Sequence, residues 1–460
     1  MASKKVSSLW DTDEFKPFKA RWDERMRELS RRKSYYDGSI YKRLREQFGW
    51  MWPRLYRGIK PLYLPLSRAV DVDAGIVPGD WALPDGSTEQ PFNKAWLPAL
   101  NQVLDWSDWD RDGVLYVHYG AQYGVSGLKM SDLREQGMVQ IKPVKPTCLL
   151  LIEQGDYDDT PQMAIYVDCR MDRTGKEYEY AEVITTEAIR TFKDGQPEKF
   201  GGRDGEYKNE LGFVPYIEVE HIKTGERWGE STYQKAIPLL DEVNELASYL
   251  ADIIKKNAEP QWVVTGAEGS DLVKSGDNVW FIPGNGKVEA LAPKVDIAGV
   301  LEFVREVRDQ VHGALPELAF DELKQKTQIA TATLELQLME LVLKIKRCRP
   351  NYDHGLADAL RLAGRAGASM GLRDLAVLDD EALAFDAKRP VLPLDRETEM
   401  RLEMMALSLE REKSMDAGEG RAGAEEARRR GGDTEPDRED APTPDPSLNP
   451  QKAGAGGSGE

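Results

Sequence analysis

Two long helical segments that bracket a short β-rich segment constrain the fold of this chain most strongly. Over residues 231–258 apolar side chains recur at a spacing of three to four, and Pro260 ends the pattern. A second helical pattern covers 297–312. The residues between them, 261–293, hold two strand-like runs, 262–265 and 279–282, and Gly-containing turns. Because the two helices must return antiparallel, we expect the β-rich insertion at their far tip.

The region before this hairpin is predicted to mix helices and strands. Apolar residues at helical spacing predict a surface helix over 13–32, helical runs broken by prolines over 40–70, and a further helix over 92–106. From about 115 to 220 short β-rich runs alternate with turn clusters, which is typical of a mostly antiparallel meander. The sequence therefore predicts an α+β fold class.

The region after the hairpin is predicted to be helical and then disordered. A long helix is expected over 328–347, with a break at Pro350 and a continuation to about 370. Apolar residues cover nearly all of its faces, so we expect it to be buried from several sides. A charged amphipathic helix follows over 396–413. Beyond residue 414 large apolar side chains are almost absent, which predicts a disordered tail.

Charge and cysteine content exclude several classes of protein. The formal net charge of −18 argues against a protein that grips DNA through a basic face. The three cysteines form no paired motif, which favours a reducing compartment over a disulfide framework or a zinc knuckle. With neither an apolar leader nor a stretch of about 18 apolar residues, we expect a soluble, unexported protein.

An acidic hexapeptide, Asp-Trp-Asp-Arg-Asp-Gly at 108–113, matches the opening of a calcium-binding EF-hand loop. A bidentate glutamate should close such a loop at its twelfth position, where this chain has Tyr119. We therefore favour an acidic turn between a helix and a strand, and expect no metal site here.

Other motifs of enzymes are missing or incomplete. A phosphate-binding loop around Gly286-Lys287 would need a glycine at Phe281 and a hydroxyl at Val288, so this segment is predicted to be a β-turn. The four histidines stand alone, without the spacing of a metal site, and no serine-hydrolase motif is present. We expect no enzymatic activity, no catalytic residues and no cofactor.

The irregular segment 313–327 between two helices mixes acidic side chains with Lys324 and Lys326. It is either a solvated helix connector or a loop directed at a polymeric anion, with the lysines as transient phosphate partners. Both interpretations remain open from these residues alone.

The order of short motifs from residue 211 onward resembles the passage from sheet to stem in portal proteins of tailed bacteriophages, of the siphophage type. The motifs are Leu-Gly-Phe-Val-Pro at 211–215, Gly-Glu-Ser-Thr-Tyr at 229–233, Ile-Pro-Leu-Leu-Asp-Glu-Val-Asn at 237–244, Asn-Ala-Glu-Pro at 257–260 and Val-Thr-Gly at 264–266. Further on, 316–320, 327–330 and 334–349 resemble the tunnel loop and long spine helix of that family. The resemblance covers roughly residues 10–394.

The resemblance implies a portal fold, with an α/β wing, a two-helix stem, a small β-containing clip, a long spine helix and a helical crown. The implied domains are the wing at 1–230, the stem helices at 231–258 and 296–312, the clip at 259–295, the tunnel loop at 313–327, the spine helix with its return to the wing at 328–394, the crown helix at 395–415 and the disordered tail at 416–460.

The resemblance also implies functional residues and partners. The tunnel-loop residues facing DNA would be Glu317, Asp321, Glu322, Lys324, Gln325 and Lys326, and the clip residues that bind partners would be Trp262, Glu268, Asp271, Lys274, Asp277 and Trp280. The expected assembly is a ring of twelve subunits at one capsid vertex, through which double-stranded DNA is packaged and ejected. Expected partners are the terminase large subunit, a head completion or adaptor protein, and the major capsid and scaffolding proteins, but no membrane. The protein would lie in the virion, and in the host cytoplasm during assembly.

Two other functions are compatible with the sequence. The chain could be another head-to-tail adaptor or assembly protein, which ring stoichiometry would distinguish. It could also be a metal-dependent enzyme acting on nucleic acid through its many carboxylates, which a nuclease or ATPase assay with magnesium would reveal.

Overall fold

The computed structural model describes residues 8–48, 63–79, 81, 93–155, 158–199, 205–225, 228–258, 261–265, 287–291, 297–319, 338–386, 389 and 391. The chain divides into two compact units, Met1–Leu392 and Pro393–Glu460, and all described residues belong to the first. The predicted crown helix and disordered tail therefore lie outside the described residues.

Among the described residues five α-helices precede the sheets, and their apolar faces explain why they form. They are α1 (Lys19–Tyr36), α2 (Ser39–Phe48), α3 (Leu66–Ile76), α4 (Trp96–Ser107) and α5 (Trp109–Tyr123). In α1 the buried apolar residues Trp22 and Leu29 lie on one side, as the spacing predicts. The helices expected over 13–32 and 92–106 are thus confirmed with small shifts of their ends.

Helix α5 corrects the prediction for residues 108–123. The acidic hexapeptide joins two helices rather than a helix and a strand, because Asp108 adopts a left-handed conformation (φ 55°) between α4 and α5. Residues 115–123, expected to begin the sheet, are helical. Tyr116, Val117 and Gly120 are buried at helical spacing, so tertiary packing outweighs the β propensity of the local sequence.

Two antiparallel sheets follow. The first contains β1 (Val125–Leu133), β2 (Met138–Val144) and β9 (Tyr216–Glu220), in the order β2-β1-β9. The second is the predicted meander, which runs in the order β3-β4-β5-β6-β7, with β8 also paired to β6. Its strands are β3 (Leu149–Gly155), β4 (Asp158–Met171), β5 (Glu177–Thr185), β6 (Ala188–Lys193), β7 (Gln196–Pro197) and β8 (Glu206–Lys208).

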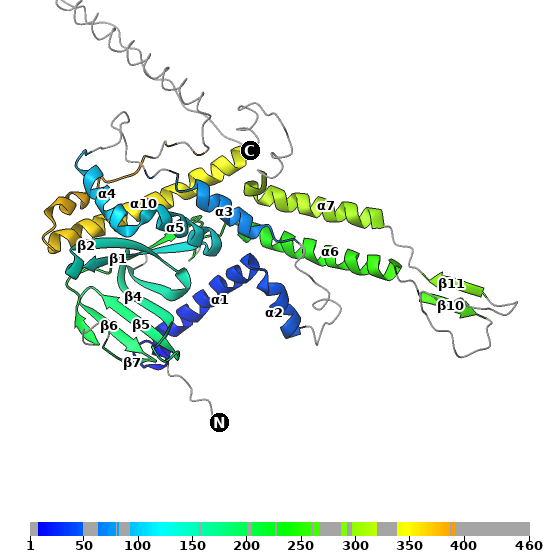
Figure 1. Cartoon of the computed structure of the whole chain (residues 1–460), viewed down its shortest axis with the longest axis horizontal. Coiled ribbons are helices and arrows are strands. Elements are labelled where there is room, and N and C mark those ends of the chain that lie inside the picture. Colours follow the sequence, from blue (N-terminus) through cyan, green and yellow to red (C-terminus); the bar gives the residue numbers. More distant parts are fainter. Residues whose placement is uncertain are drawn as a thin grey trace, which may run out of the picture. The chain divides into compact units, whose positions relative to one another are not determined.

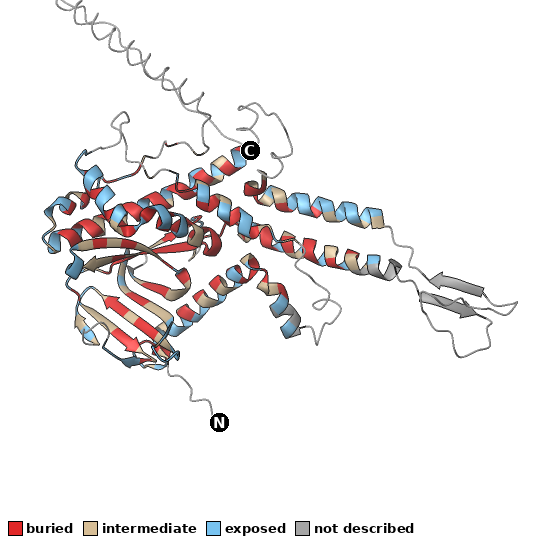
Figure 2. Ribbon diagram, in the orientation of Figure 1, coloured by how far each residue is buried: buried red, intermediate tan, exposed pale blue. Residues whose placement is uncertain are grey.

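Helix α10 (Met339–Ser369) provides the centre of the largest core cluster. It packs on the β2-β1-β9 sheet, and Figure 2 shows its continuous stripe of buried residues. The break predicted at Pro350 is wrong, since the helix continues through this residue. Burial of Ile345, Cys348, Tyr352 and Leu356 on both sides of Pro350 offsets the roughly 3 kcal/mol that an interior proline costs.

The predicted helical hairpin is present as α6 (Ile237–Ala258) and α7 (Ile297–Ala314), which lie side by side in Figure 1. They run antiparallel, because the beginning of α6 and the end of α7 share one core cluster. The segment inserted between them contains β10 (Gln261–Thr265), paired antiparallel with β11 (Lys287–Leu291). The strand predicted over 279–282 lies outside the described residues.

Candidate functional site

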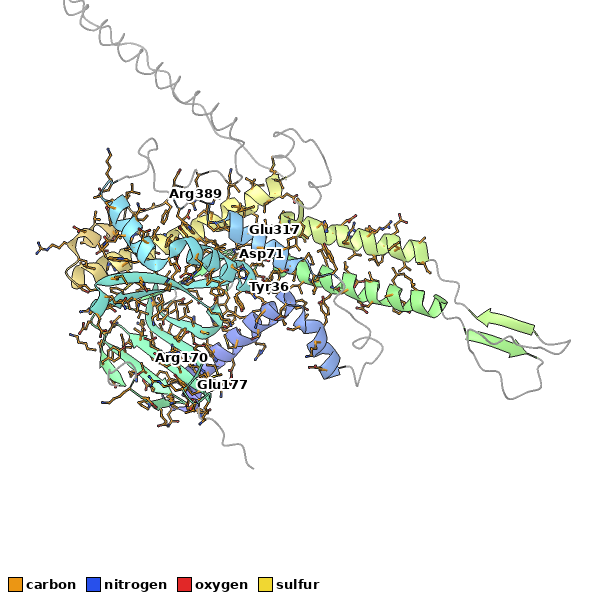
Figure 3. All side chains as sticks on the ribbon, viewed as in Figure 1. Tyr36, Asp71, Arg170, Glu177, Glu317 and Arg389 are labelled. Carbon is orange, nitrogen blue, oxygen red and sulfur yellow. The ribbon has the colours of Figure 1, made fainter. Side chains whose placement is uncertain are left out.

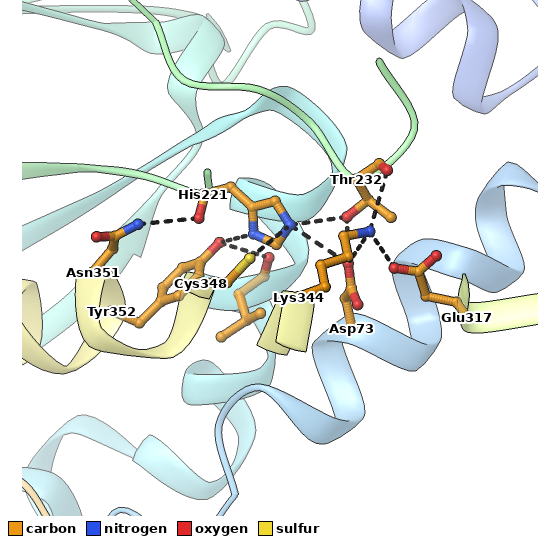
Figure 4. Close-up of polar contacts among 9 residues, drawn as sticks. Asp73, His221, Thr232, Glu317, Lys344, Cys348, Asn351 and Tyr352 are labelled. Atoms are coloured by element: carbon orange, nitrogen blue, oxygen red, sulfur yellow. Dashed lines mark hydrogen bonds and ion pairs between the residues drawn. The ribbon is translucent and has the colours of Figure 1, made fainter. Parts of the chain in front are cut away.

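A cluster of buried polar side chains lies where α3, α10, the segment before α6 and the short helix η6 (Pro316–Leu318) meet (Figure 4). Its members come from parts of the chain that are far apart in sequence. They are Asp73, His221, Thr232, Glu317, Lys344, Cys348, Asn351 and Tyr352. We call this set the polar junction, because it connects the base of the α6–α7 hairpin to the long helix α10.

His221 and Thr232 link three elements within the polar junction. The Thr232 hydroxyl donates to Asp73 Oδ2 at 2.5 Å and lies 3.0 Å from His221 Nε2. His221 Nδ1 lies 2.8 Å from the Tyr352 hydroxyl on α10. The exposed fraction of the His221 and Asp73 side chains is 0%. These contacts hold α3, α10 and the residues leading into α6 together.

Lys344 supplies the cation at the other end of the polar junction. Its Nζ forms an ion pair with Glu317, lies 3.5 Å from Asp73 Oδ2, and donates to the Thr232 carbonyl at 3.2 Å. Glu317 is completely buried, and Figure 3 shows it where the end of α7 meets α3. A cavity of about 280 Å³, lined by residues that include Lys344 and Ala314, opens beside this group.

Burial and neighbouring charges shift the pKa values of these groups in different directions. Burial alone would raise the pKa of Asp73, but Lys344 and His221 outweigh it, so this pKa lies below its ordinary value. Burial, together with the charge of Asp73, raises the pKa of Glu317 to about 7 despite Lys344. Burial would lower the pKa of His221, but Cys348 and Asp73 raise it to about 9. Lys344 therefore lies beside two different carboxylates. Asp73 is ionised at neutral pH, whereas Glu317 titrates near pH 7.

Glu317→Gln is expected to reduce the pH dependence of stability between pH 5 and 8. The folded protein binds the Glu317 proton more tightly than the unfolded chain, where a glutamate has a pKa of about 4.3. The contribution of protonated Glu317 to the free energy of unfolding is therefore complete below about pH 4.3, and it is lost as the pH rises through about 7. We expect the wild type to lose about 2 kcal/mol more than the variant over this range, measured by denaturant unfolding at each pH.

Glu302→Gln serves as the matched control, since Glu302 is exposed on α7. It should follow the wild-type profile. An unchanged profile in Glu317→Gln would show that Glu317 keeps its ordinary pKa.

The placement of Glu317 corrects the prediction that it faces DNA from the tunnel loop. A carboxylate with an exposed fraction of 0% that pairs with Lys344 is unable to line an open channel. Its burial follows from η6, which packs against α3 and α10. The other predicted loop residues, Asp321, Glu322, Lys324, Gln325 and Lys326, lie outside the described residues.

The predicted partner-binding residues of the insertion are mostly outside the described part of the chain. Trp262 belongs to β10, opposite Ala290 of β11. Glu268, Asp271, Lys274, Asp277 and Trp280 lie outside the described residues.

The sequence interpretation missed the polar junction. Its histidine, His221, stands alone in the sequence, yet it is fully buried among these side chains. One signal was available: Lys344 is a cation within a helix whose neighbours Leu341 and Ile345 are apolar and buried. A lysine at such a position requires a buried acidic partner.

Most polar groups of the polar junction contact one another, but Asp73 Oδ1 and Glu317 Oε2 have no hydrogen-bond partner among the described residues. Within the described residues no group of three or more acidic, histidine or cysteine side chains could hold a metal ion. Cys348 is buried with an exposed fraction of 0%, so its thiol is not accessible. In the same part of the chain, no helix combines the length and apolar character needed to cross a membrane. The geometry is that of a rigid connection between structural elements.

Comparison with protein families gives one match. Residues 113–314 match the family described as "Phage portal protein, SPP1 Gp6-like". The match covers less than half of the chain, and it includes most of α5, both sheets and the whole α6–α7 hairpin. The resemblance to portal proteins is thereby confirmed over these residues. The comparison with curated proteins finds no match.

Comparison with solved structures finds chains of gene transfer agent particles. A chain of "Virion of native gene transfer agent (GTA) particle" is 12% identical with a TM-score of 0.40, over 65% of this chain and 77% of that one. A chain of "Neck of native GTA particle computed with C12 symmetry" is 13% identical with a TM-score of 0.37, over 66% and 78%.

Proposed function

Because residues 113–314 match the portal protein family, we propose that this chain forms a closed homo-oligomeric ring of twelve subunits at a capsid vertex, around a channel for double-stranded DNA. The observation that carries this proposal is the family match across both sheets and the hairpin. The hairpin with a β insertion at the junction of its helices supports it, because an axial conduit needs a projecting element to which partners bind.

We assign the elements to portal domains on this basis. The two sheets and α1–α5 would form the wing, α6 and α7 the stem, the insertion with β10 and β11 the clip, and α10 the spine helix. Residues 395–415 would form the crown. The clip would bind the terminase large subunit during packaging and a head completion or adaptor protein afterwards, and the capsid and scaffolding proteins would surround the ring.

The polar junction has a role in this proposal as the anchor of the tunnel loop. The tunnel loop at 313–327 would contain η6, whose Glu317 is paired with Lys344 of the spine helix. A force on the loop would therefore be transmitted to α10 through a buried ion pair and not through exposed contacts. An acidic channel wall would repel phosphates and keep friction low, while a few lysines make weak, exchangeable contacts.

Native mass spectrometry of the purified full-length chain tests the proposal. We expect one closed species with a single subunit number over a wide range of protein concentration. A monomer at all concentrations, or a mixture of open oligomers with different subunit numbers, would contradict the proposal. ATPase and nuclease assays with magnesium on the same sample should be negative, since ATP hydrolysis would belong to the terminase.

Replacing Lys324 and Lys326 by Ala is expected to change DNA packaging or retention without preventing ring assembly. Both lysines belong to the proposed tunnel loop, where they would contact phosphates transiently. The measurement is the amount of DNA retained per particle, together with the mass of the purified variant. If the variant fails to form rings, the segment has a structural role and its assignment as a tunnel loop is wrong.

A further inference from the structure

The α6–α7 hairpin exposes two rows of side chains with opposite charge. On α6, Glu242, Glu245 and Tyr249 are exposed at positions i, i+3 and i+7, which lie on one side of a helix. Tyr249 is 68% exposed although it is large and partly apolar. We call these three residues the acidic row.

The second row is on α7. Leu301, Arg305 and Arg308 are exposed at positions i, i+4 and i+7, again on one side of the helix. We call them the basic row. Leu301 is 37% exposed, so this row also combines charge with an apolar side chain. The acidic residues of α7, such as Glu302 and Glu306, fall on a different face.

Neither row is covered by the other helix of the same hairpin. The hairpin is held together by Leu240 and Val243 of α6, which are buried in one cluster with Val307 and Val311 of α7. With about 100° of rotation per residue and antiparallel axes, the acidic row and the basic row face opposite flanks of the hairpin. Figure 2 shows most of α7 as exposed, whereas in α6 exposed residues alternate with buried and intermediate ones.

The charges of the two rows have little compensation within the chain. Among the described residues, Glu242, Glu245 and Arg305 form no ion pair, and Arg308 pairs only with its sequence neighbour Asp309, at 2.9 Å. Glu242, Glu245 and Arg305 are thus available, while Arg308 has only its sequence neighbour Asp309 as a partner. Each row also contains one large exposed apolar side chain.

We propose that the basic row of one subunit packs against the acidic row of the next, so that this contact repeats around the ring. This inference rests on the proposed ring and names the contact that would hold its stem together. A contact between two different surfaces of identical chains is heterologous, and repetition of such a contact closes a ring when the rotation fits. Each subunit carries one acidic row and one basic row. A second copy of this chain is therefore the complementary partner.

Charge complementarity favours a second copy over DNA as the occupant. A duplex lying against the basic row would gain two phosphate contacts, but it would be repelled wherever it approached the acidic row. In the subunit contact the carboxylates of the acidic row would lie opposite the arginines of the basic row. Tyr249 and Leu301 would also lose exposed apolar surface.

Charge exchange between the rows tests the pairing. Glu242→Lys with Glu245→Lys, and separately Arg305→Glu with Arg308→Glu, should each reduce the fraction of assembled protein at least about tenfold, because like charges would face each other. The variant that combines all four substitutions restores opposite charges and should recover assembly to near the wild-type level. Native mass spectrometry reports the assembled fraction, and thermal unfolding confirms that each variant is folded.

Glu302→Lys with Glu306→Lys is the matched control, since it changes the charge of α7 by the same magnitude, with opposite sign, on another face. It should leave assembly unchanged. If the wild type forms rings while the paired substitutions do not reduce assembly, or if the four-fold variant fails to recover it, the pairing is wrong although the ring stands. A wild type without rings would overturn the proposed function itself.

Discussion

Lys344→Met is expected to lower the free energy of unfolding by about 3–5 kcal/mol, because it removes one partner of a buried ion cluster. Glu317 would then lose the lysine with which it pairs, and Asp73 would keep only His221 as a charged partner, although both carboxylates have an exposed fraction of 0%. Methionine preserves most of the side-chain length, so the loss reports the charge more than the packing. Denaturant unfolding monitored by circular dichroism measures it.

Lys346→Met is the control for this prediction, since Lys346 is exposed on the same helix two residues further on. It should change stability by no more than about 0.5 kcal/mol. Adding Asp73→Asn to Lys344→Met should recover part of the loss, because the remaining buried charge is then smaller. A loss below about 1 kcal/mol in Lys344→Met would mean that water compensates the two carboxylates and that the polar junction is not sealed.

Gly120→Ala is expected to destabilise the protein by about 3 kcal/mol, the upper range for overpacking in a core. An added Cβ at Gly120 would overlap the Tyr352 hydroxyl and lie 2.8 Å from its ring carbon Cζ. Tyr352 has no free space into which to move, since it is fully buried and its hydroxyl contacts His221 at 2.8 Å. The packing of the Tyr352 side chain of α10 against α5 thus requires glycine at position 120.

Gly75→Ala provides the comparison for this substitution. Gly75 also lies within a helix, α3, but nothing would meet an added Cβ within 4 Å. This variant should be neutral or more stable by up to about 1 kcal/mol, because alanine favours the helix. Equal effects of the two substitutions on the melting temperature would show that Tyr352 does not pack against Gly120.

The hairpin could be predicted because its determinants are local. Apolar residues at regular spacing predict both helices, and the proline after α6 predicts the end of the first. The structure differs from the predicted ranges by a few residues. Residues 115–123 were predicted wrongly for the opposite reason. Their Leu, Tyr and Val content suggests a strand, and only the packing of Tyr116 and Val117 into the central core selects the helix.

The polar junction could not be predicted because nothing local marks it. Asp73, His221 and Lys344 are separated by more than a hundred residues, and each alone is an ordinary polar residue. Their partnership depends on the way α3 and α10 pack around the residues that lead into α6. Glu317 shows the same limit, since its position in an acidic connector suggested exposure while the packing of η6 buries it.

Electron microscopy of the purified chain tests whether the protein forms a ring around a channel. We expect closed rings of uniform subunit number, with an axial hole wide enough to pass a DNA duplex and the hairpins side by side around it. Particles that remain single subunits even when concentrated, or compact assemblies without an axial opening, would contradict it.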